Sequence, residues 1–332
     1  MQPEPSVATA TPAASSRTPT RANPLTGSLV ALAALALFNV FTTPGFLSAQ
    51  TLNVNLTQVA TVVIVACGMT LVVATGGIDL SVGSLMAIAG AISPMIFTAP
   101  ALEGSSLGVL LGVLVPMLVA GAFGLFNAVL ITAGRIQPII ATLVLFIAGR
   151  GIAQVITNGN LQTLSDAGFQ YIGLGRPLGV PFQVILMVLV VVVVAWIVRA
   201  TVLGRFILAV GGNERAARLA GVPVTAVKLF VYGLCGMLAG LAGLVVIAIN
   251  SSSDANQVGL NMELDAIAAV AVGGTVLSGG NARVVGTLLG ALLIQLIRYT
   301  LLVKGVPDAA ALVVKAAIIV AAVYLQRARG TA

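Results

Sequence analysis

Long apolar runs separated by short polar segments dominate this chain of 332 residues. Each run approaches the roughly 20 residues that a helix needs to cross a bilayer. Glycine and proline inside the runs do not exclude a span, because neighbouring helices re-satisfy loosened backbone groups. The pattern predicts an all-α fold, a polytopic transmembrane helical bundle that forms one domain over residues 25–328. Its ten predicted spans lie near residues 27–43, 55–75, 82–99, 107–132, 138–157, 182–200, 229–250, 263–279, 284–302 and 309–326.

Composition supports a membrane protein. Hydrophobic residues make up 59% of the chain and charged residues only 8%, with a mean hydropathy of +1.12, whereas soluble domains carry about 25% charged residues. Residues 1–24 are rich in Pro, Ser, Thr and Ala and predict a disordered cytoplasmic tail. A cleaved signal peptide is the competing interpretation of the first apolar run. No basic residue precedes Arg17, Glu4 is acidic and no clear A-x-A site follows, so we favour a retained span.

Basic residues gather on one side of the predicted bundle. If the N-terminus is cytoplasmic, the outer loops hold only Arg176 and Lys304. The inner side then holds Arg17, Arg21, Arg135, Arg199, Arg205, Arg215, Arg218, Lys228, Arg283, Arg327 and Arg329. With an even number of spans, the positive-inside rule places both termini in the cytoplasm. The excess of basic residues therefore reflects membrane topology. Binding nucleic acid would need a basic surface on a soluble domain, and the sequence predicts no such domain.

Several kinds of chemistry are absent from the sequence. The chain has no histidine, so it offers no His-based triad and no imidazole metal ligand. Cys67 and Cys235 both fall inside predicted spans, where a thiol behaves as a small apolar residue. Each lysine follows a valine, so there is no Gly-Lys-Ser/Thr phosphate loop. We expect no catalytic residue, no metal site and no ATP hydrolysis by that route.

The one long segment suited to water is the predicted cytoplasmic loop 201–228, which is amphipathic and charged. Asn213 is a favoured helix N-cap, Glu214 complements the positive end of the helix dipole, and Gly221 can end the helix in the left-handed conformation. An ordinary positive-inside loop is the alternative to a docking site for a partner. The candidate docking residues are Gly204, Arg205, Asn213, Glu214, Arg215, Ala216, Ala217 and Gly221.

The pattern Gly-Gly-x-x-Leu-Ser-x-Gly occurs twice, at residues 76–83 and 273–280. In the first copy the glycines break one helix, and Asp79 or Ser81 can cap the next. The alternative is a hydrogen bond of an inner gate that breaks as the pathway opens. The repetition fits either an internal duplication or convergent helix-joint chemistry. The candidate gate or joint residues are Gly76, Gly77, Asp79, Ser81, Gly273, Gly274 and Ser278.

Inserting an ionisable residue at the middle of a membrane helix costs about 2.5–3.5 kcal/mol on insertion scales, so each such residue needs a structural or functional explanation. The predicted topology places an outer charge cluster in the outer half of the membrane, formed by Arg150 together with Glu263, Asp265, Arg298 and Lys315. These groups either line or pair across an outward vestibule, or extend to the lipid headgroups. The candidate substrate-path residues are Asn127, Thr142, Arg150 and Gln154. Hydrogen bonds between helices are the alternative role for the uncharged members.

Three blocks of sequence carry a family resemblance: 68–83, 204–223 and 272–291. Together they resemble the permease subunits of ATP-binding-cassette importers for monosaccharides, the ribose and galactofuranose group. Residues 141–151 and 263–267 are similar to the galactofuranose-type member in particular. The resemblance covers about residues 55–326 and departs from relatives at 294–299.

The resemblance implies how such a permease is driven. In this family a short cytoplasmic helix docks in a cleft of a separate ATPase subunit. Residues 214–221 match its Glu-Ala-Ala…Gly pattern, with Arg215 in place of the first alanine. The implied partners are the ATPase subunits, which bind the ATP and Mg, a second permease as homodimer or heterodimer, and a periplasmic sugar-binding protein. This chain would bind no cofactor and would import a monosaccharide across the bacterial inner membrane by alternating access.

Alternatives remain open at this stage. Permeases of the same family for branched-chain amino acids or nucleosides are the nearest. An ion-coupled secondary transporter would need carboxylates at mid-membrane, whereas every acidic residue here maps to a span end or a loop. A membrane-embedded enzyme would need a nucleophile and a base that converge, and the sequence offers none.

Overall fold

The computed structural model describes residues 24–307, 310–314, 316–317 and 320. The predicted tail before residue 24, most of the predicted tenth span and Lys315 lie outside the described residues. The helices are α1 (Pro24–Thr42), α2 (Ala49–Ala74), α3 (Val82–Phe97), α4 (Ser106–Thr132), α5 (Pro138–Thr157), α6 (Ala167–Leu174), α7 (Phe182–Ala200), α8 (Val202–Gly212), α9 (Glu214–Leu219), α10 (Val224–Asn250), α11 (Met262–Val272) and α12 (Val284–Val303), with a 3₁₀ turn η1 (Pro177–Gly179).

The described part of the chain is all-α except for two short strands. Strands β1 (Gln162–Thr163) and β2 (Ser252–Ser253) pair antiparallel. Among the described residues, six helices are long and apolar enough to cross a membrane: α2, α4, α5, α7, α10 and α12. This confirms a polytopic membrane protein, while the total of ten spans stays a prediction.

Helix α11 departs from its predicted span. The apolar run predicted a helix near 263–279, yet α11 ends at Val272. Eleven residues extend only about 16 Å, about half of the hydrocarbon core. Gly274 has φ +81° and Gly279 has φ +92°, conformations that no helix contains. The run is apolar but not continuously helical, so α11 is a half-helix.

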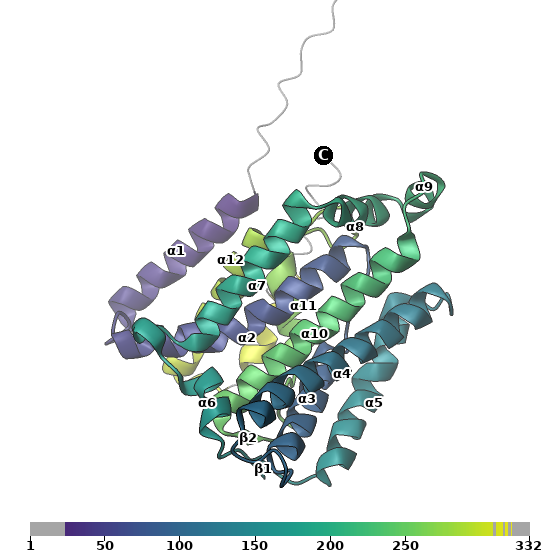
Figure 1. Ribbon diagram of the computed structural model, residues 1–332. Coiled ribbons are helices and arrows are strands. Elements are labelled where there is room, and N and C mark those ends of the chain that lie inside the picture. Colours follow the sequence, from purple (N-terminus) through teal and green to yellow (C-terminus); the bar gives the residue numbers. More distant parts are fainter. Residues whose placement is uncertain (1–23, 308–309, 315, 318–319, 321–332) are drawn as a thin grey trace, which may run out of the picture.

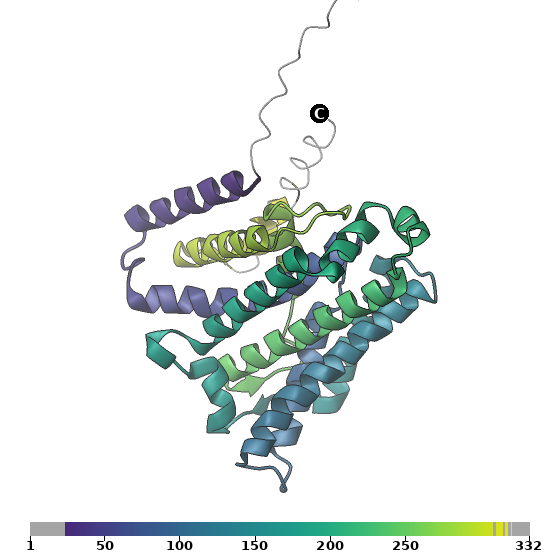
Figure 2. The same ribbon diagram turned by 45° about the horizontal axis from the view of Figure 1, so that its top comes forward.

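Helices α2, α3 and α10 form the centre of the bundle. In their most apolar windows, α2 is 83% buried and α10 is 72% buried, whereas α4, α5 and α7 are each 28% buried. Helices that are apolar all round and still exposed require a lipid environment. Figure 2 shows α1 and α12 on one side of this centre and α4 and α5 on the other. The lipid-facing surface is therefore formed mainly by the outer helices.

Glycines allow the central helices to pack closely. A Cβ at Gly236 of α10 would collide with the carbonyl oxygen of Ala120 on α4, and one at Gly124 with the carbonyl oxygen of Tyr232. Small residues at such contacts are typical of membrane helix pairs, because dispersion replaces the hydrophobic effect there. The α4–α10 pair is thus fixed backbone to backbone.

The two ends of the bundle differ. Helices α8 and α9 lie together at the upper right of Figure 1, whereas α6, β1 and β2 lie at the bottom. Arg205, Arg215 and Arg218, three of the eleven basic residues predicted on the inner side, belong to the first end. We name it the α9 end and the other the β1–β2 end.

Candidate functional site

The turn from α7 into α8 leaves no room for a side chain. Thr201 caps α8 by accepting the amide of Gly204 at 3.1 Å. A Cβ at Gly204 would collide with the carbonyl oxygen of Val198, so glycine lets α8 fold back against the end of α7. Arg205, next in the chain, is exposed. Gly204 is therefore a structural requirement of the segment that carries α9.

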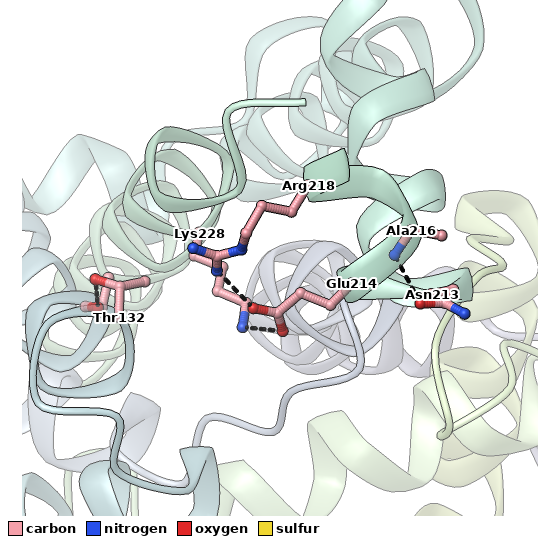
Figure 3. Close-up of polar contacts among 7 residues, drawn as sticks. Thr132, Asn213, Glu214, Ala216, Arg218 and Lys228 are labelled. Carbon is pink, nitrogen blue, oxygen red and sulfur yellow. Dashed lines mark hydrogen bonds and ion pairs between the residues drawn. The ribbon is translucent and has the colours of Figure 1, made fainter. Parts of the chain in front are cut away.

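Helix α9 begins and ends as the sequence predicts. The Oδ1 of Asn213 accepts the amide of Ala216 at 2.9 Å, and Figure 3 shows this bond at the start of the helix. Gly221 has φ +82° and its amide donates to the carbonyl of Arg218 at 3.1 Å. Asn213 also closes α8, so one residue joins the two helices. The cap and the left-handed stop are both confirmed.

Glu214 holds α9 against the start of α10. One carboxylate oxygen accepts from Lys228 Nζ at 2.7 Å and the other from Arg218 Nη2 at 3.2 Å (Figure 3). Partial burial raises the pKa of the Glu214 carboxyl, but the hydrogen bonds and charges of Lys228 and Arg218 outweigh that effect and hold the pKa below its ordinary value. Glu214 thus does more than complement the helix dipole, because it also fixes α9 against the start of α10.

The outer face of α9 combines positive charge with an exposed apolar group. Arg215 and Arg218 are exposed, Ala216 is exposed beside them, and Ala217 is buried against the bundle. Leu219 has 83% of its surface exposed, although it lies at the water-facing end of the bundle. Sequence reasoning missed Leu219, an apolar residue directly after Arg218 in the charged segment. We call Arg215, Arg218 and Leu219 the α9 surface.

The two copies of the repeated pattern meet in space. The amide of Gly280 donates to the carbonyl of Ala74, the last residue of α2, at 3.0 Å. A Cβ at Gly76 would lie 3.6 Å from the carbonyl oxygen of Ser278. The α2–α3 joint (residues 75–81) and the α11–α12 joint (residues 273–283) are therefore adjacent. Gly273 itself packs against the backbone of Gly286, where an added Cβ would collide.

Asp79 organises the α2–α3 joint. Its Oδ1 accepts the amide of Ser81 at 2.9 Å and the Ser81 hydroxyl at 2.6 Å. Ser81 occupies the N-cap position of α3 without a side-chain capping bond of its own. Both residues are fully buried. The structure therefore supports the local helix-joint interpretation of Asp79, and an additional role in gating stays a prediction.

Two predicted path residues hold this joint. Asn127 of α4 donates through Nδ2 to the Ser81 hydroxyl at 2.9 Å, and the Thr142 hydroxyl of α5 accepts the amide of Leu80 at 3.2 Å. Tyr232 of α10 lies on the other side, where a Cβ at Gly77 would collide with its hydroxyl. Polar groups from three helices thus surround a single buried turn.

The other two path residues hold a segment that enters the bundle from the β1–β2 end. Arg150 Nη1 donates to the carbonyls of Ala255, Asn256 and Val258 at 2.8, 3.1 and 3.2 Å. Gln154 Nε2 donates to Asn256 Oδ1 at 2.7 Å. Residues 251–261 therefore form a non-helical segment fixed to α5, of the kind that occurs at membrane depth only where protein surrounds it.

Glu263 is buried inside the bundle, whereas the sequence predicts it in a charge cluster near the outer surface. Its side chain is buried, and a Cβ at Gly83, the second residue of α3, would lie 2.6 Å from its Oε2. Arg150 is close enough to Glu263 and Asp254 for electrostatic attraction. Asp265 and Arg298 both interact within the structure, on α11 and α12. The structure thus places Arg150 within electrostatic range of Glu263, and a common vestibule with the other charged residues stays a prediction.

A cavity of about 460 Å³ lies at the β1–β2 end. Its lining includes Thr98, Glu103, Ser105 and Asp166. None of the four predicted path residues lines it, and no sequence pattern predicts it. The cavity is lined by acidic and hydroxyl side chains and lies at the opposite end of the bundle from the α9 surface.

Comparison with known proteins gives a consistent result. A family model described as "Branched-chain amino acid transport system / permease component" matches residues 51–323. The ribose import permease protein RbsC of Escherichia coli K12 is 42% identical over 302 residues, which cover 90% of this chain and 92% of that protein. The galactofuranose transporter permease protein YtfT of the same strain is 42% identical over 278 residues, or 82% and 79%. The L-arabinose ABC transporter permease protein AraH of Azospirillum brasilense is 34% identical over 301 residues, or 91% and 86%. No solved structure matches the chain.

Proposed function

Because the chain belongs to the family of transport-system permease components, we propose that it is the permease of an ATP-driven importer that moves a monosaccharide into the cytoplasm. It would reside in the bacterial inner membrane with both termini cytoplasmic. A second permease and two ATPase subunits would complete the transporter, and a periplasmic sugar-binding protein would deliver the cargo. ATP and Mg would be bound by the ATPase subunits, and no nucleic acid would be involved.

The α9 surface carries this proposal. An apolar side chain that is 83% exposed beside two exposed arginines has no evident role in a lone protein. It suits a partner that buries leucine in a pocket and pairs arginine with acidic groups, since such desolvated anchors dominate interface energies. The cap at Asn213 and the ion pairs of Glu214 keep α9 in one orientation. Because α9 is held in this way, a partner that moves α9 would also move the helices attached to it.

Monosaccharides are the favoured cargo because the similar relatives are named for ribose, galactofuranose and L-arabinose. The four polar residues that the sequence offers for a substrate path are already bonded to protein groups: Asn127, Thr142, Arg150 and Gln154. A sparsely polar path suits conduction, which needs weak binding. Specificity would then reside largely in the binding protein.

Alternating access would use the discontinuous elements. The half-helix α11, the segment 251–261 and the two adjacent joints are places where regular helix stops inside the bundle. Transporters place their pathways at such breaks, because helix ends move there without unfolding a whole span. We propose that ATP-driven movement of residues 204–223 rearranges these breaks.

Ion-coupled transport remains the contrasting function for one reason. Asp79 lies in the α2–α3 joint and Glu263 in the first turn of α11, as expected of acidic residues at span ends or in loops, but both are buried within the bundle. Buried carboxylates are the residue type that ion coupling uses. An ion-gradient condition therefore belongs in the experiment, and leucine belongs among the competitors because the family description names branched-chain amino acids.

The experiment is co-purification with the ATPase, followed by uptake in proteoliposomes. We expect ATP and the binding protein to be required for uptake of a labelled pentose or hexose, with no uptake driven by a sodium or proton gradient alone. Leu219→Glu should abolish ATPase co-purification, whereas the matched change Leu178→Glu, at an exposed leucine of the β1–β2 end, should leave it intact. Gradient-driven uptake without the ATPase would refute the proposal, as would equal ATPase recovery with both variants.

A further inference from the structure

The end of α8 touches both helix joints at once. A Cβ at Gly211 would collide with the carbonyl oxygen of Ala74 and lie 2.5 Å from the amide nitrogen of Gly280. Those two backbone groups also bond to each other at 3.0 Å. Three chain segments that are far apart in sequence therefore meet backbone to backbone, with no side chain between them.

The other glycines of this contact are equally constrained. A Cβ at Gly279 would lie 2.8 Å from both the Gly211 carbonyl oxygen and the Gly76 amide nitrogen. Gly76, Gly279 and Gly280 have φ of +80°, +92° and +75°, which side chains rarely adopt. We call Ala74, Gly76, Gly211, Gly279 and Gly280 the glycine junction.

The junction lies directly behind α9. Gly211 is two residues before Asn213, the single residue that closes α8 and opens α9. The amide of Asn213 donates to the carbonyl of Ala209 at 3.1 Å, so the two helices are joined without a flexible linker. A displacement of α9 must therefore move Gly211 or deform α8.

We propose that Gly211 is a positioning residue of transport, through which α8 displaces the α2–α3 and α11–α12 joints together. The proposal rests on the proposed function, since it requires an ATPase that moves α9. Close-packed backbone transmits displacement because it cannot be compressed, and side chains that change rotamer would absorb the movement instead. The two segments that carry the repeated pattern both contribute glycine to this contact, Gly76 from the first and Gly279 and Gly280 from the second, although at different positions of the pattern.

The adjacent residue provides a matched control. A Cβ at Gly212 would meet nothing within 4 Å, although Gly212 is also a glycine in the last turn of α8. Alanine at either position has the same effect on helix propensity, so only the contact distinguishes the two variants. Gly211→Ala should separate α8 from the joints, whereas Gly212→Ala should not.

The experiment measures sugar transported per ATP hydrolysed in proteoliposomes with the ATPase and the binding protein. We expect Gly211→Ala to co-purify with the ATPase and hydrolyse ATP, but to transport at least 10-fold less sugar per ATP than Gly212→Ala. Equal ratios in the two variants would overturn the proposal. Failure of the unmodified chain to bind the ATPase would instead refute the proposed function.

A second measurement avoids the alanine variants in case Gly211→Ala does not fold. Spin labels at exposed Ala209 of α8 and exposed Val276 of the α11–α12 joint should keep their separation when ATP binds. A label pair at Ala209 and Leu178 should change its separation, because Leu178 lies at the other end. If the first pair changes as much as the second, α8 slides past the joint and the proposal is wrong.

Discussion

Replacing Asn213 with alanine removes the oxygen that accepts the amide of Ala216 at 2.9 Å. Loss of such a cap costs about 1 kcal/mol. Helix α9 has only six residues, and isolated helices of that length are marginal, so its first turn depends on this cap and on the ion pairs of Glu214. An energy of about 1 kcal/mol corresponds to an increase of about fivefold in the population in which α9 is open.

Hydrogen exchange measures this population directly. The amides of Ala217 and Ala220 bond to the carbonyls of Asn213 and Ala216, which the substitution keeps. Their exchange should accelerate about fivefold in Asn213→Ala, because local opening controls the rate. Asn213→Asp should restore protection, since aspartate caps equally well and favours the positive helix end.

Amides in the middle of α10 serve as the internal control and should exchange as before. The apparent affinity for the ATPase should fall by no more than the same factor, because only the open fraction is lost from binding. Unchanged exchange of Ala217 and Ala220 would show that the cap does not hold α9. Fast exchange in both the alanine and the aspartate variants would show that Asn213 acts by another route.

Two further predictions concern the interior. Arg150→Leu removes three hydrogen bonds to residues 255–258, so uptake should fall more than 10-fold while ATPase co-purification persists, and normal uptake in liposomes would remove Arg150 from the pathway. Asp79→Ala leaves the buried amide and hydroxyl of Ser81 without their acceptor, which should destabilise the detergent-solubilised protein by about 1–3 kcal/mol in thermal unfolding. Asp79→Asn keeps an acceptor oxygen and should lose less than half of that stability. Equal losses in the two variants would contradict the role of Asp79 as the acceptor that holds the α2–α3 joint.

Local patterns predicted the parts of the structure that depend on local physics. The apolar runs at 138–157 and 182–200 coincide with α5 and α7, because helix length and hydropathy are read from consecutive residues. The start and end of α9 followed from Asn213 and Gly221 for the same reason. The same hydropathy misjudged α11, since Val276 and Leu277 extend an apolar run that the backbone of Gly274 had already ended.

Contacts between distant segments carried no such signal. Gly211 is helical, so nothing in its neighbourhood requires glycine, and the requirement comes from Ala74 and Gly280 alone. The burial of Asp79 has the same origin, because the joint is enclosed by α4, α5 and α10. Hydropathy predicts that helices end at the membrane boundaries, yet here helices also end inside the bundle. Residues at those internal helix ends are the hardest to predict from sequence, and they are also the places where a conformational change disturbs the fewest helical hydrogen bonds.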